Sequence, residues 1–331
     1  MATDVLEIRD LVAAVRQRRA VVPLVDGVSL RIGRATSVGL VGESGSGKSM
    51  TALSILKLLP PSVEIVSGQI LINGRDLVPL GDAGMRKIRA REVAMIFQDP
   101  MSSLTPTMTI GRQVAEAVRV HSGGSRAETE RRVVELLSMV GFPRPAERLK
   151  TYPHQLSGGQ RQRVMIAMAL AGGAELLIAD EPTTALDVTI QAQILDLLDD
   201  LEQRLGMALL LITHDMGVIA SRCDRVVVMY AGQVVENAGT ANLFAACRHP
   251  YTAALLALIP SLDADAGQVL PTIPGVPPEP SAFPPGCRFA PRCRYSTEVC
   301  RVEQPSLDDP LGTGHFFACH HPLGIDQQAP P

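Results

Sequence analysis

An eight-residue loop near the N-terminus has the composition of a phosphate-binding site. Residues 42–49 read Gly-Glu-Ser-Gly-Ser-Gly-Lys-Ser and satisfy the pattern G-x-x-x-x-G-K-[ST]. The glycines let the backbone approach a phosphate chain, and backbone N–H groups and the Lys48 ammonium can then converge on its β- and γ-phosphates. The Ser49 hydroxyl can ligate Mg²⁺. The residues predicted to contact the nucleotide are Gly42, Ser44, Gly45, Ser46, Gly47, Lys48, Ser49 and Met50.

The segments on either side of this loop agree with that prediction. Residues 36–41 are a short apolar run typical of a buried strand, and residues 50–59 predict a helix. The alternative is a Gly/Ser turn before an ordinary helix, but strand, loop and helix stand in the order that a phosphate loop requires. The sequence therefore predicts that the chain binds a nucleoside triphosphate.

A pair of acids supplies a second part of the predicted chemistry. Asp180 and Glu181 end the apolar run 175–181. An aspartate at a strand end can hold Mg²⁺, and the adjacent glutamate can orient the attacking water and act as its general base. The alternative is that the two acids only cap the next helix. The continuation Pro-Thr-Thr-Ala-Leu-Asp at 182–187 weakens this alternative.

Two more polar residues stand at the ends of predicted strands. Gln98 follows the buried run 93–97, and His214 follows the run 208–213. Strand ends hold ligands in an α/β sheet, so Gln98 is predicted beside the nucleotide and its Mg²⁺. His214 could donate to the γ-phosphate and hold the water in line, although a lone histidine is more often a surface or core residue.

Residues 156–160, Leu-Ser-Gly-Gly-Gln, predict a second anion-binding helix start. They stand just before the apolar helix predicted at 164–170, where unpaired backbone N–H groups favour an anion. One nucleotide hardly needs two such sites from one chain. Two subunits that face each other head to tail would use both, each offering Ser157, Gly158, Gly159 and Gln160 to the nucleotide on the other's phosphate loop.

Four cysteines close to the C-terminus predict a metal site. In a cytosolic chain such a cluster favours metal over disulfides. Four thiolates suit a [4Fe–4S] cluster or Zn²⁺, and the wide spacing suits the cluster better, because structural zinc prefers C-x₂₋₄-C pairs. Unliganded thiols are the third alternative. The four residues are Cys287, Cys293, Cys300 and Cys319.

The remaining pattern predicts the elements that position these residues. Residues 5–34 alternate apolar and polar side chains, as half-buried antiparallel strands do, and residues 110–170 give helical signals. From residue 261 the chain is rich in Pro and Gly, with little periodicity. The other predicted elements are a strand at 68–74, an amphipathic helix at 126–140, a hairpin of 226–230 and 233–236, and a helix near 251–258.

Composition limits the class of protein. The 331 residues suffice for one large domain with an appendage or for two domains, and 46% of them are apolar. The net charge of −3 gives no reason to expect nucleic acid as a partner. No apolar run approaches the roughly 20 residues of a membrane span, and the N-terminus shows no signal-peptide pattern, so a cytoplasmic protein is expected.

Together these motifs resemble the ATPase subunits of ABC transporters over residues 5–260. The matching features are the phosphate loop, the Q-loop glutamine Gln98, the signature 156–160, the Walker B strand 176–181, the D-loop 185–187 and the switch histidine His214. The resemblance implies an α/β fold with a P-loop NTPase (RecA-like) core, an antiparallel β subdomain and an α-helical signature subdomain at about 100–170. It also assigns Asp187 to the nucleotide site.

The same resemblance implies how the subunit works. Two such subunits close around two ATP molecules, hydrolysis reopens them, and the motion drives a pair of membrane-spanning permease subunits. Gln98 senses nucleotide and couples to the permease through the loop 99–106. A soluble ABC ATPase of DNA repair or translation is the rival, but those proteins carry a coiled-coil insertion or two cassettes, which this chain lacks.

Finer motifs resemble the dipeptide/oligopeptide/nickel importer ATPases, closest to the first ATPase subunit of dipeptide permeases. They are residues 98–106, 152–155, 229–232 and 248–252, together with a loop-rich, Cys-containing extension at 261–331 that follows a nucleotide-binding domain at 1–260. The resemblance implies peptide uptake at the cytoplasmic face of the inner membrane with an extracytoplasmic binding protein. Nickel and glutathione importers share these motifs, so the cargo stays open. Some relatives carry a [4Fe–4S] cluster in this extension.

One position departs from the family pattern. The family places an aromatic residue that stacks on adenine just before the strand predicted at 25–32, where this chain has Val22. No aromatic residue precedes Phe97. Aromatic stacking adds roughly 0.5–1.5 kcal/mol beyond area burial, so weaker discrimination between bases is predicted.

Overall fold

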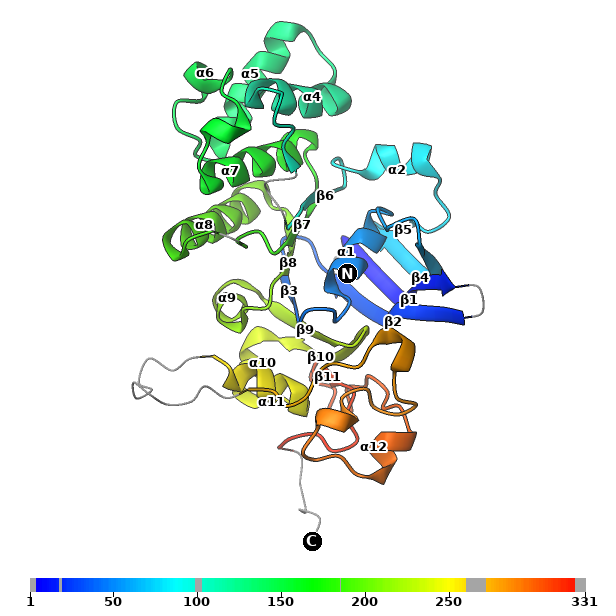
Figure 1. The fold of residues 1–331 in the computed structure, drawn as a ribbon. Helices are drawn as coiled ribbons and strands as arrows, with labels where there is room; N and C mark the ends of the chain where they lie inside the picture. Colours follow the sequence, from blue (N-terminus) through cyan, green and yellow to red (C-terminus); the bar gives the residue numbers. More distant parts are fainter. Residues whose placement is uncertain (1–3, 18–19, 99–102, 185, 260–271, 325–331) are drawn as a thin grey trace. The chain divides into compact units, whose positions relative to one another are not determined.

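The computed structural model of the chain describes residues 4–17, 20–98, 103–184, 186–259 and 272–324. The described residues, whose helices and strands Figure 1 labels, divide into two compact units. Unit 1 is built from those of 1–6, 32–36 and 72–210, and unit 2 from those of 7–31, 37–71 and 211–331. Each unit therefore combines segments that lie far apart in the sequence.

Three neighbouring strands, most of whose residues lie in unit 2, form a sheet with one buried face. Their order is β2 (Ala20–Ile32), β1 (Leu6–Gln17) and β4 (Val63–Ile72). In β2, Val28 and Leu30 are at most 3% exposed, whereas Arg31 is exposed. This alternation confirms the half-buried strands predicted from residues 5–34. Strand β4 begins five residues before the predicted start at 68.

A second group of strands in unit 2 leads to the phosphate loop. Strand β3 is parallel to β9, with Leu40 opposite Val227, and β9 is antiparallel to β10. The two-residue turn between β9 and β10 has positive φ at both Ala231 and Gly232, which is the type I′ conformation that a right-twisted hairpin favours. The predicted hairpin is thus confirmed. In order across the sheet the strands are β11 (Phe316–Phe317), β10 (Gln233–Gly239), β9 (Arg225–Tyr230) and β3 (Ser37–Val41).

Helices of unit 2 follow these strands. Helix α1 begins two residues before the predicted start at 50 and ends at Ile55. It ends early because Lys57 adopts a left-handed φ of 49°, which stops the helix before Pro60. The helices of unit 2 are α1 (Lys48–Ile55), α9 (Met216–Arg222), α10 (Thr240–Ala246), α11 (Pro250–Ala257) and α12 (Glu298–Val302), with the short 3₁₀ helices η3 (Pro280–Ala282) and η4 (Ala290–Arg292).

The strands of unit 1 confirm the predicted buried runs. Strand β6 (Val93–Ile96) is parallel to β7 (Leu176–Asp180), and every residue of β7 is buried. Strand β8 (Ala208–Ile212) begins in unit 1, where the N–H of Ala208 donates to the carbonyl of Glu175 at 2.8 Å. Each observed strand stops one residue short of its predicted end. Unit 1 also contains β5 (Arg75–Asp76) and α2 (Asp82–Ile88).

A group of helices forms the larger part of unit 1 (Figure 1). Helix α5 begins with a capping box between Ser125 and Glu128, and it buries Val133 and Leu136, which confirms the amphipathic helix predicted at 126–140. In the described parts of the chain, no helix combines the length and apolar character that crossing a membrane requires. The helices are α4 (Ile110–Ser122), α5 (Arg126–Met139), α6 (Pro145–Arg148), η1 (Pro153–Gln155), α7 (Gly158–Ala169), η2 (Leu170–Gly172) and α8 (Val188–Leu205).

Candidate nucleotide-binding and metal-binding residues

The phosphate loop of unit 2 connects β3 to α1 and needs glycine at two positions. Gly42 has a φ of 150°, and a Cβ there would lie 2.1 Å from the carbonyl oxygen of Met229. Gly47 has a φ of 101°, and its Cβ would lie 2.8 Å from the carbonyl oxygen of Leu24. Both the conformation and the close approach exclude larger residues. The loop therefore runs directly into the N-terminal end of α1, an arrangement that binds phosphate.

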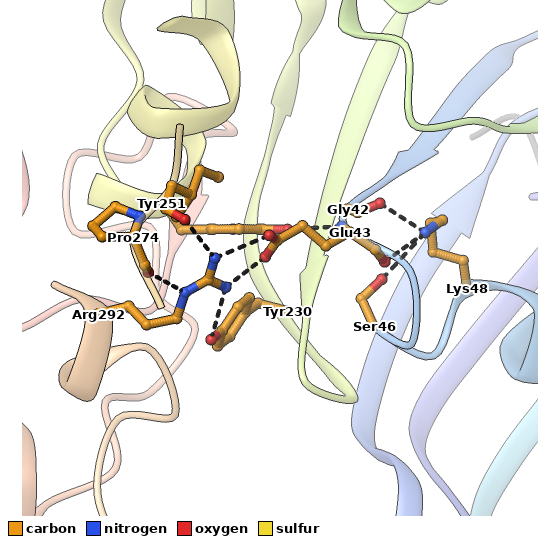
Figure 2. A network of polar contacts seen from close by, with 9 residues as sticks. Gly42, Glu43, Ser46, Lys48, Tyr230, Tyr251, Pro274 and Arg292 are labelled. Carbon is orange, nitrogen blue, oxygen red and sulfur yellow. Dashed lines mark hydrogen bonds and ion pairs between the residues drawn. The ribbon is translucent and has the colours of Figure 1, made fainter. Parts of the chain in front are cut away.

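The ammonium of Lys48 is held against this loop. Its Nζ donates to the carbonyl oxygens of Gly42 at 2.7 Å and Glu43 at 2.9 Å, and to Ser46 Oγ at 3.4 Å (Figure 2). Lys48 is only 6% exposed, so its positive charge is fixed beside the loop backbone that would receive a phosphate chain. Among the other predicted contacts, Ser46 is buried, Ser49 and Met50 are half-buried, and Ser44 and Gly45 are exposed.

His214 also belongs to unit 2, where it lies in the turn between β8 and α9. It is exposed and precedes Asp215, whose carboxylate caps α9. The N–H of Thr213 donates to the carbonyl of Leu40 at 3.3 Å. The turn that carries His214 is therefore hydrogen-bonded to β3, the strand that leads into the phosphate loop.

In unit 1 the structure brings Gln98 and Glu181 together. Asp180 is the last residue of β7 and is 4% exposed, whereas Glu181 turns out of the strand with a left-handed φ of 45° that is uncommon for a non-glycine residue. Gln98 Nε2 donates to Glu181 Oε2 at 2.8 Å, and Thr184 Oγ1 donates to the same oxygen at 2.9 Å. Two donors therefore orient this carboxylate. Thr184 was not predicted from the sequence, although a hydroxyl three residues after an acid is a usable turn signal.

The signature segment of unit 1 starts helix α7. Ser157 Oγ accepts from the N–H of Gln160, and Gln160 Oε1 accepts from the N–H of Ser157, both at 3.3 Å. This capping box begins the helix at residue 158, which confirms the helix start predicted at 156–160 and places it six residues before the apolar run 164–170. A Cβ on Gly159 would lie 2.5 Å from Ile190 Cγ2 in α8. The glycine therefore lets α7 start in close contact with α8.

Asp187 caps the next helix. Its Oδ1 accepts from the N–H of Ile190 at 3.0 Å, which satisfies an N–H group in the first turn of α8. The carboxylate thus has a structural contact within unit 1. Its assignment to the nucleotide stays a prediction. Of the predicted coupling loop 99–106, residues 99–102 lie outside the described residues.

The four cysteines of the predicted metal site surround one small cavity in unit 2. The cavity has a volume of about 20 Å³, room for about one water molecule. Burial raises the pKa of Cys287 and Cys293 and raises that of Cys319 to about 12, so these thiols are neutral at pH 7. The cavity is lined by Cys287, Cys293, Cys300 and Cys319 with His249, Pro250, Phe289, Ala290, Tyr295, His320 and His321.

The residues around this cavity are of types that ligate metals, but neither their arrangement nor the cavity volume matches a four-iron cube. The imidazole Nε2 of His249, a residue that is 1% exposed, is buried and has no hydrogen-bond partner among the described residues. An unpartnered ring nitrogen beside four thiols suits a bound group. The small volume, however, suits a single ion, and across the described ranges no group of three or more potential ligands has the geometry of a metal site. The [4Fe–4S] expectation gains no support here.

Sequence comparison shows close relatives over nearly the whole chain. The ABC transporter family matches residues 25–184, and the family "Oligopeptide/dipeptide transporter, C-terminal region" matches residues 235–300. The probable peptide ABC transporter ATP-binding protein y4tR of Sinorhizobium fredii is 50% identical, covering 95% of this chain and 94% of the relative. The dipeptide transport ATP-binding protein DppD of Escherichia coli is 50% identical (90% and 91% covered), and the oligopeptide transport ATP-binding protein AppD of Bacillus subtilis is 51% identical (92% and 93% covered).

Solved structures share the fold. The ATP-binding cassette MJ0796, solved as a dimer in a post-hydrolysis state with ADP and Pi, matches with a TM-score of 0.63 and 28% identity over 71% of this chain and 98% of that one. The protein cbiO1 of Clostridium perfringens, part of an ABC transporter complex, matches with a TM-score of 0.64 and 26% identity over 73% and 91%. These matches confirm the expected α/β P-loop NTPase fold. The chain belongs to the ATP-hydrolysing subunits of ABC transporters, in the group that carries the oligopeptide/dipeptide transporter C-terminal region.

Proposed function

We propose that the chain powers the import of di- or oligopeptides. The observation that carries this proposal is the similarity of about 50% identity, over at least nine tenths of the chain, to ATP-binding proteins named for peptide, dipeptide and oligopeptide transport. The nucleotide-binding domain would comprise residues 1–260 and the extension residues 261–331. The subunit would act at the cytoplasmic face of the membrane with two permease subunits and an extracytoplasmic binding protein, and without nucleic acid.

Nucleotide binding would rest on the phosphate loop. Its backbone N–H groups and the Lys48 ammonium would hold the β- and γ-phosphates, since a helix start and a buried cation both favour an anion. Ser49, Asp180 and Gln98 would be the protein ligands of Mg²⁺. When bound, the Mg²⁺ ion neutralises charge on the phosphates.

Hydrolysis would use Glu181 as the general base. Gln98 and Thr184 donate to one oxygen of its carboxylate, which fixes the orientation in which it takes a proton from water. His214 would donate to the γ-phosphate and keep that water in line. A second ATPase subunit, placed head to tail, would offer the start of its α7 to the γ-phosphate, with Asp187 close to the shared boundary.

The Glu181→Gln variant tests the catalytic assignment. The amide keeps the shape of the side chain and an oxygen that accepts from Gln98, but it cannot take a proton, so turnover should nearly cease while ATP-bound dimers accumulate. ATPase assays and size-exclusion chromatography with ATP measure the two effects. The matched control is Glu175→Gln at the other end of β7, where the carboxylate pairs with Arg34 at 2.6 Å, and it should hydrolyse ATP normally. Undiminished hydrolysis by Glu181→Gln would exclude Glu181 as the base.

Uptake assays identify the cargo. Cells that express the chain with its permease should accumulate a labelled dipeptide or oligopeptide, and Lys48→Ala should abolish that uptake. Accumulation of nickel or glutathione instead would redirect the assignment within the same family group. ATP hydrolysis with no uptake of any of these would favour a soluble ABC ATPase.

The cysteine cavity is proposed to hold a metal centre, either a [4Fe–4S] cluster or Zn²⁺. Four thiols and the unpartnered His249 nitrogen around one cavity support a bound metal. Anaerobic purification followed by iron, acid-labile sulfide and zinc assays separates the candidates. About four irons and four sulfides per chain establish the cluster, one zinc establishes a structural zinc site, and no metal overturns the proposal. Cys247→Ser, which alters a thiol outside the cavity lining, is the control and should not change the metal content.

A further inference from the structure

An arginine of the C-terminal segment, by which we mean the described residues 272–324, forms an ion pair with the phosphate loop. Arg292 Nη1 donates to Glu43 Oε2 at 2.6 Å, and Nη2 donates to Glu43 Oε1 at 3.0 Å (Figure 2). Glu43 is the second residue of the phosphate loop, and the two partners are 249 positions apart in the sequence. Two parallel bonds between a guanidinium and a carboxylate form a bidentate pair, which fixes the orientation of both groups as well as neutralising them.

The guanidinium of Arg292 is also held by contacts other than Glu43. Its Nε donates to the carbonyl oxygen of Pro274 at 2.8 Å, and its Nη1 also donates to Tyr230 Oη at 3.3 Å (Figure 2). The guanidinium carbon lies 5.7 Å from the ring centroid of Tyr230 and 5.9 Å from that of Phe289, within the range of cation–π contacts. The side chain is only 4% exposed. Arg292 is thus a rigid anchor.

Glu43 links this anchor to Lys48. The backbone N–H of Glu43 donates to Tyr251 Oη at 2.8 Å, and its carbonyl oxygen accepts from Lys48 Nζ at 2.9 Å. Glu43 is therefore held at its amide, its carbonyl and its carboxylate at once. A shift of this residue would move one of the oxygens that orient the Lys48 ammonium.

The C-terminal segment reaches the same loop at a second point. Arg288 donates to the carbonyl oxygen of Ala231 and to the carboxylate of Asp26. The N–H of Gly232, the next residue, donates to the carbonyl oxygen of Ser46 at 2.9 Å. Ser46 of the phosphate loop is therefore hydrogen-bonded to the hairpin turn of Ala231 and Gly232, and Arg288 donates to the same turn.

We propose that Arg292 is a positioning residue for nucleotide binding. By holding Glu43, it keeps the Gly42 and Glu43 carbonyls where they direct the Lys48 ammonium toward a phosphate chain. It also neutralises a carboxylate that would otherwise repel a polyphosphate. The inference rests on ATP as the ligand of the loop. It gives the C-terminal segment a part in nucleotide affinity, in addition to any metal that the cysteines bind.

Measuring the affinity for ATP directly distinguishes a role of Arg292 in nucleotide binding from a role in stability alone. The full chain is titrated with ATP in the presence of EDTA, which prevents turnover, by isothermal calorimetry, and its melting temperature is measured in parallel. Arg292→Ala should raise the Kd for ATP about tenfold, because it leaves the Glu43 charge uncompensated. Arg292→Lys should raise it less, about threefold, because an ammonium restores the charge but not the bidentate geometry.

Two further variants complete the design. In the double variant Glu43→Gln with Arg292→Ala, the uncompensated charge is gone, so the Kd should fall back toward the wild-type value from that of Arg292→Ala alone. Arg294→Ala is the matched control, since Arg294 belongs to the same segment, is exposed and donates to Tyr295 Oη at 2.6 Å. Its Kd should equal that of wild type.

The outcomes distinguish the inference from the function on which it rests. An unchanged Kd in Arg292→Ala, with only the melting temperature lowered, would overturn the positioning role and leave the ATPase assignment intact. If Arg292→Ala does not fold, an unchanged Kd in Arg292→Lys has the same meaning. A wild-type chain that binds no ATP would instead refute nucleotide binding itself.

Discussion

Replacing Gly159 by alanine should destabilise unit 1, because the added methyl group would meet helix α8. The Cβ would lie 2.5 Å from Ile190 Cγ2, far inside the ordinary carbon–carbon contact distance of about 3.5–4.0 Å. Overpacking of this kind costs about 1–3 kcal/mol, whereas a glycine-to-alanine change within a helix returns up to about 1 kcal/mol through helix propensity. The free energy of unfolding should therefore fall by about 1–2 kcal/mol.

Urea unfolding of the full chain without nucleotide measures this loss. Gly158→Ala is the matched control, since its Cβ would come within 3.0 Å of Leu186 Cδ2, the end of a flexible side chain that can turn away. Its stability should stay within about 0.5 kcal/mol of wild type. In an Ile190→Ala background the clashing methyl group is absent, so Gly159→Ala should cost little there.

An equal loss of stability in both backgrounds would refute the contact with Ile190 as its cause. A second result would be equally informative. If Gly159→Ala keeps wild-type stability but loses ATPase activity, the glycine is needed for the nucleotide of the partner subunit rather than for the packing of α7 against α8.

Three other substitutions test neighbouring parts of the argument. Gly42→Ala should abolish ATP binding, because its Cβ would lie 2.1 Å from the carbonyl oxygen of Met229, and a wild-type calorimetric titration would contradict this. Asp187→Ala should lower the free energy of unfolding by about 1 kcal/mol through loss of the α8 cap, whereas Asp187→Asn should retain most of it in urea unfolding. Val22→Tyr should raise the preference for ATP over GTP in competition binding by supplying a stacking ring, and strict ATP preference in the wild-type chain would count against the reasoning.

Local sequence patterns found the phosphate loop because all its parts are contiguous. Strand β3, the loop and α1 follow one another without interruption, and glycine spacing is itself the signal. The ends of helices were predicted less well, since single residues decide them. The left-handed Lys57 ends α1 early, and the capping box of Ser157 and Gln160 starts α7 six residues before its apolar pattern begins.

Contacts between distant segments could not be predicted from the sequence. Glu43 and Arg292 carry ordinary charges, and an arginine in a bidentate pair looks the same in sequence as one on a solvated surface. The pairing of β11 with β10 could not be predicted either, because a two-residue strand shows no periodicity in the sequence. The four cysteines near the C-terminus indicated a common site. The volume of the cavity between them could not be predicted, because it depends on how the surrounding chain packs.

The ion pair between Arg292 and Glu43 should matter more for nucleotide binding than for folding. Desolvation of the Arg292 guanidinium, whose side chain is 4% exposed, offsets part of its attraction to the carboxylate, so the pair adds less net stability than its short distances suggest. Glu43 is 26% exposed, so water partly solvates its carboxylate when the arginine is removed. A triphosphate, by contrast, brings several negative charges to the phosphate loop, and Glu43 is a residue of that loop. An uncompensated Glu43 therefore opposes ATP directly, and the loss of Arg292 should appear in the Kd before it appears in the melting temperature.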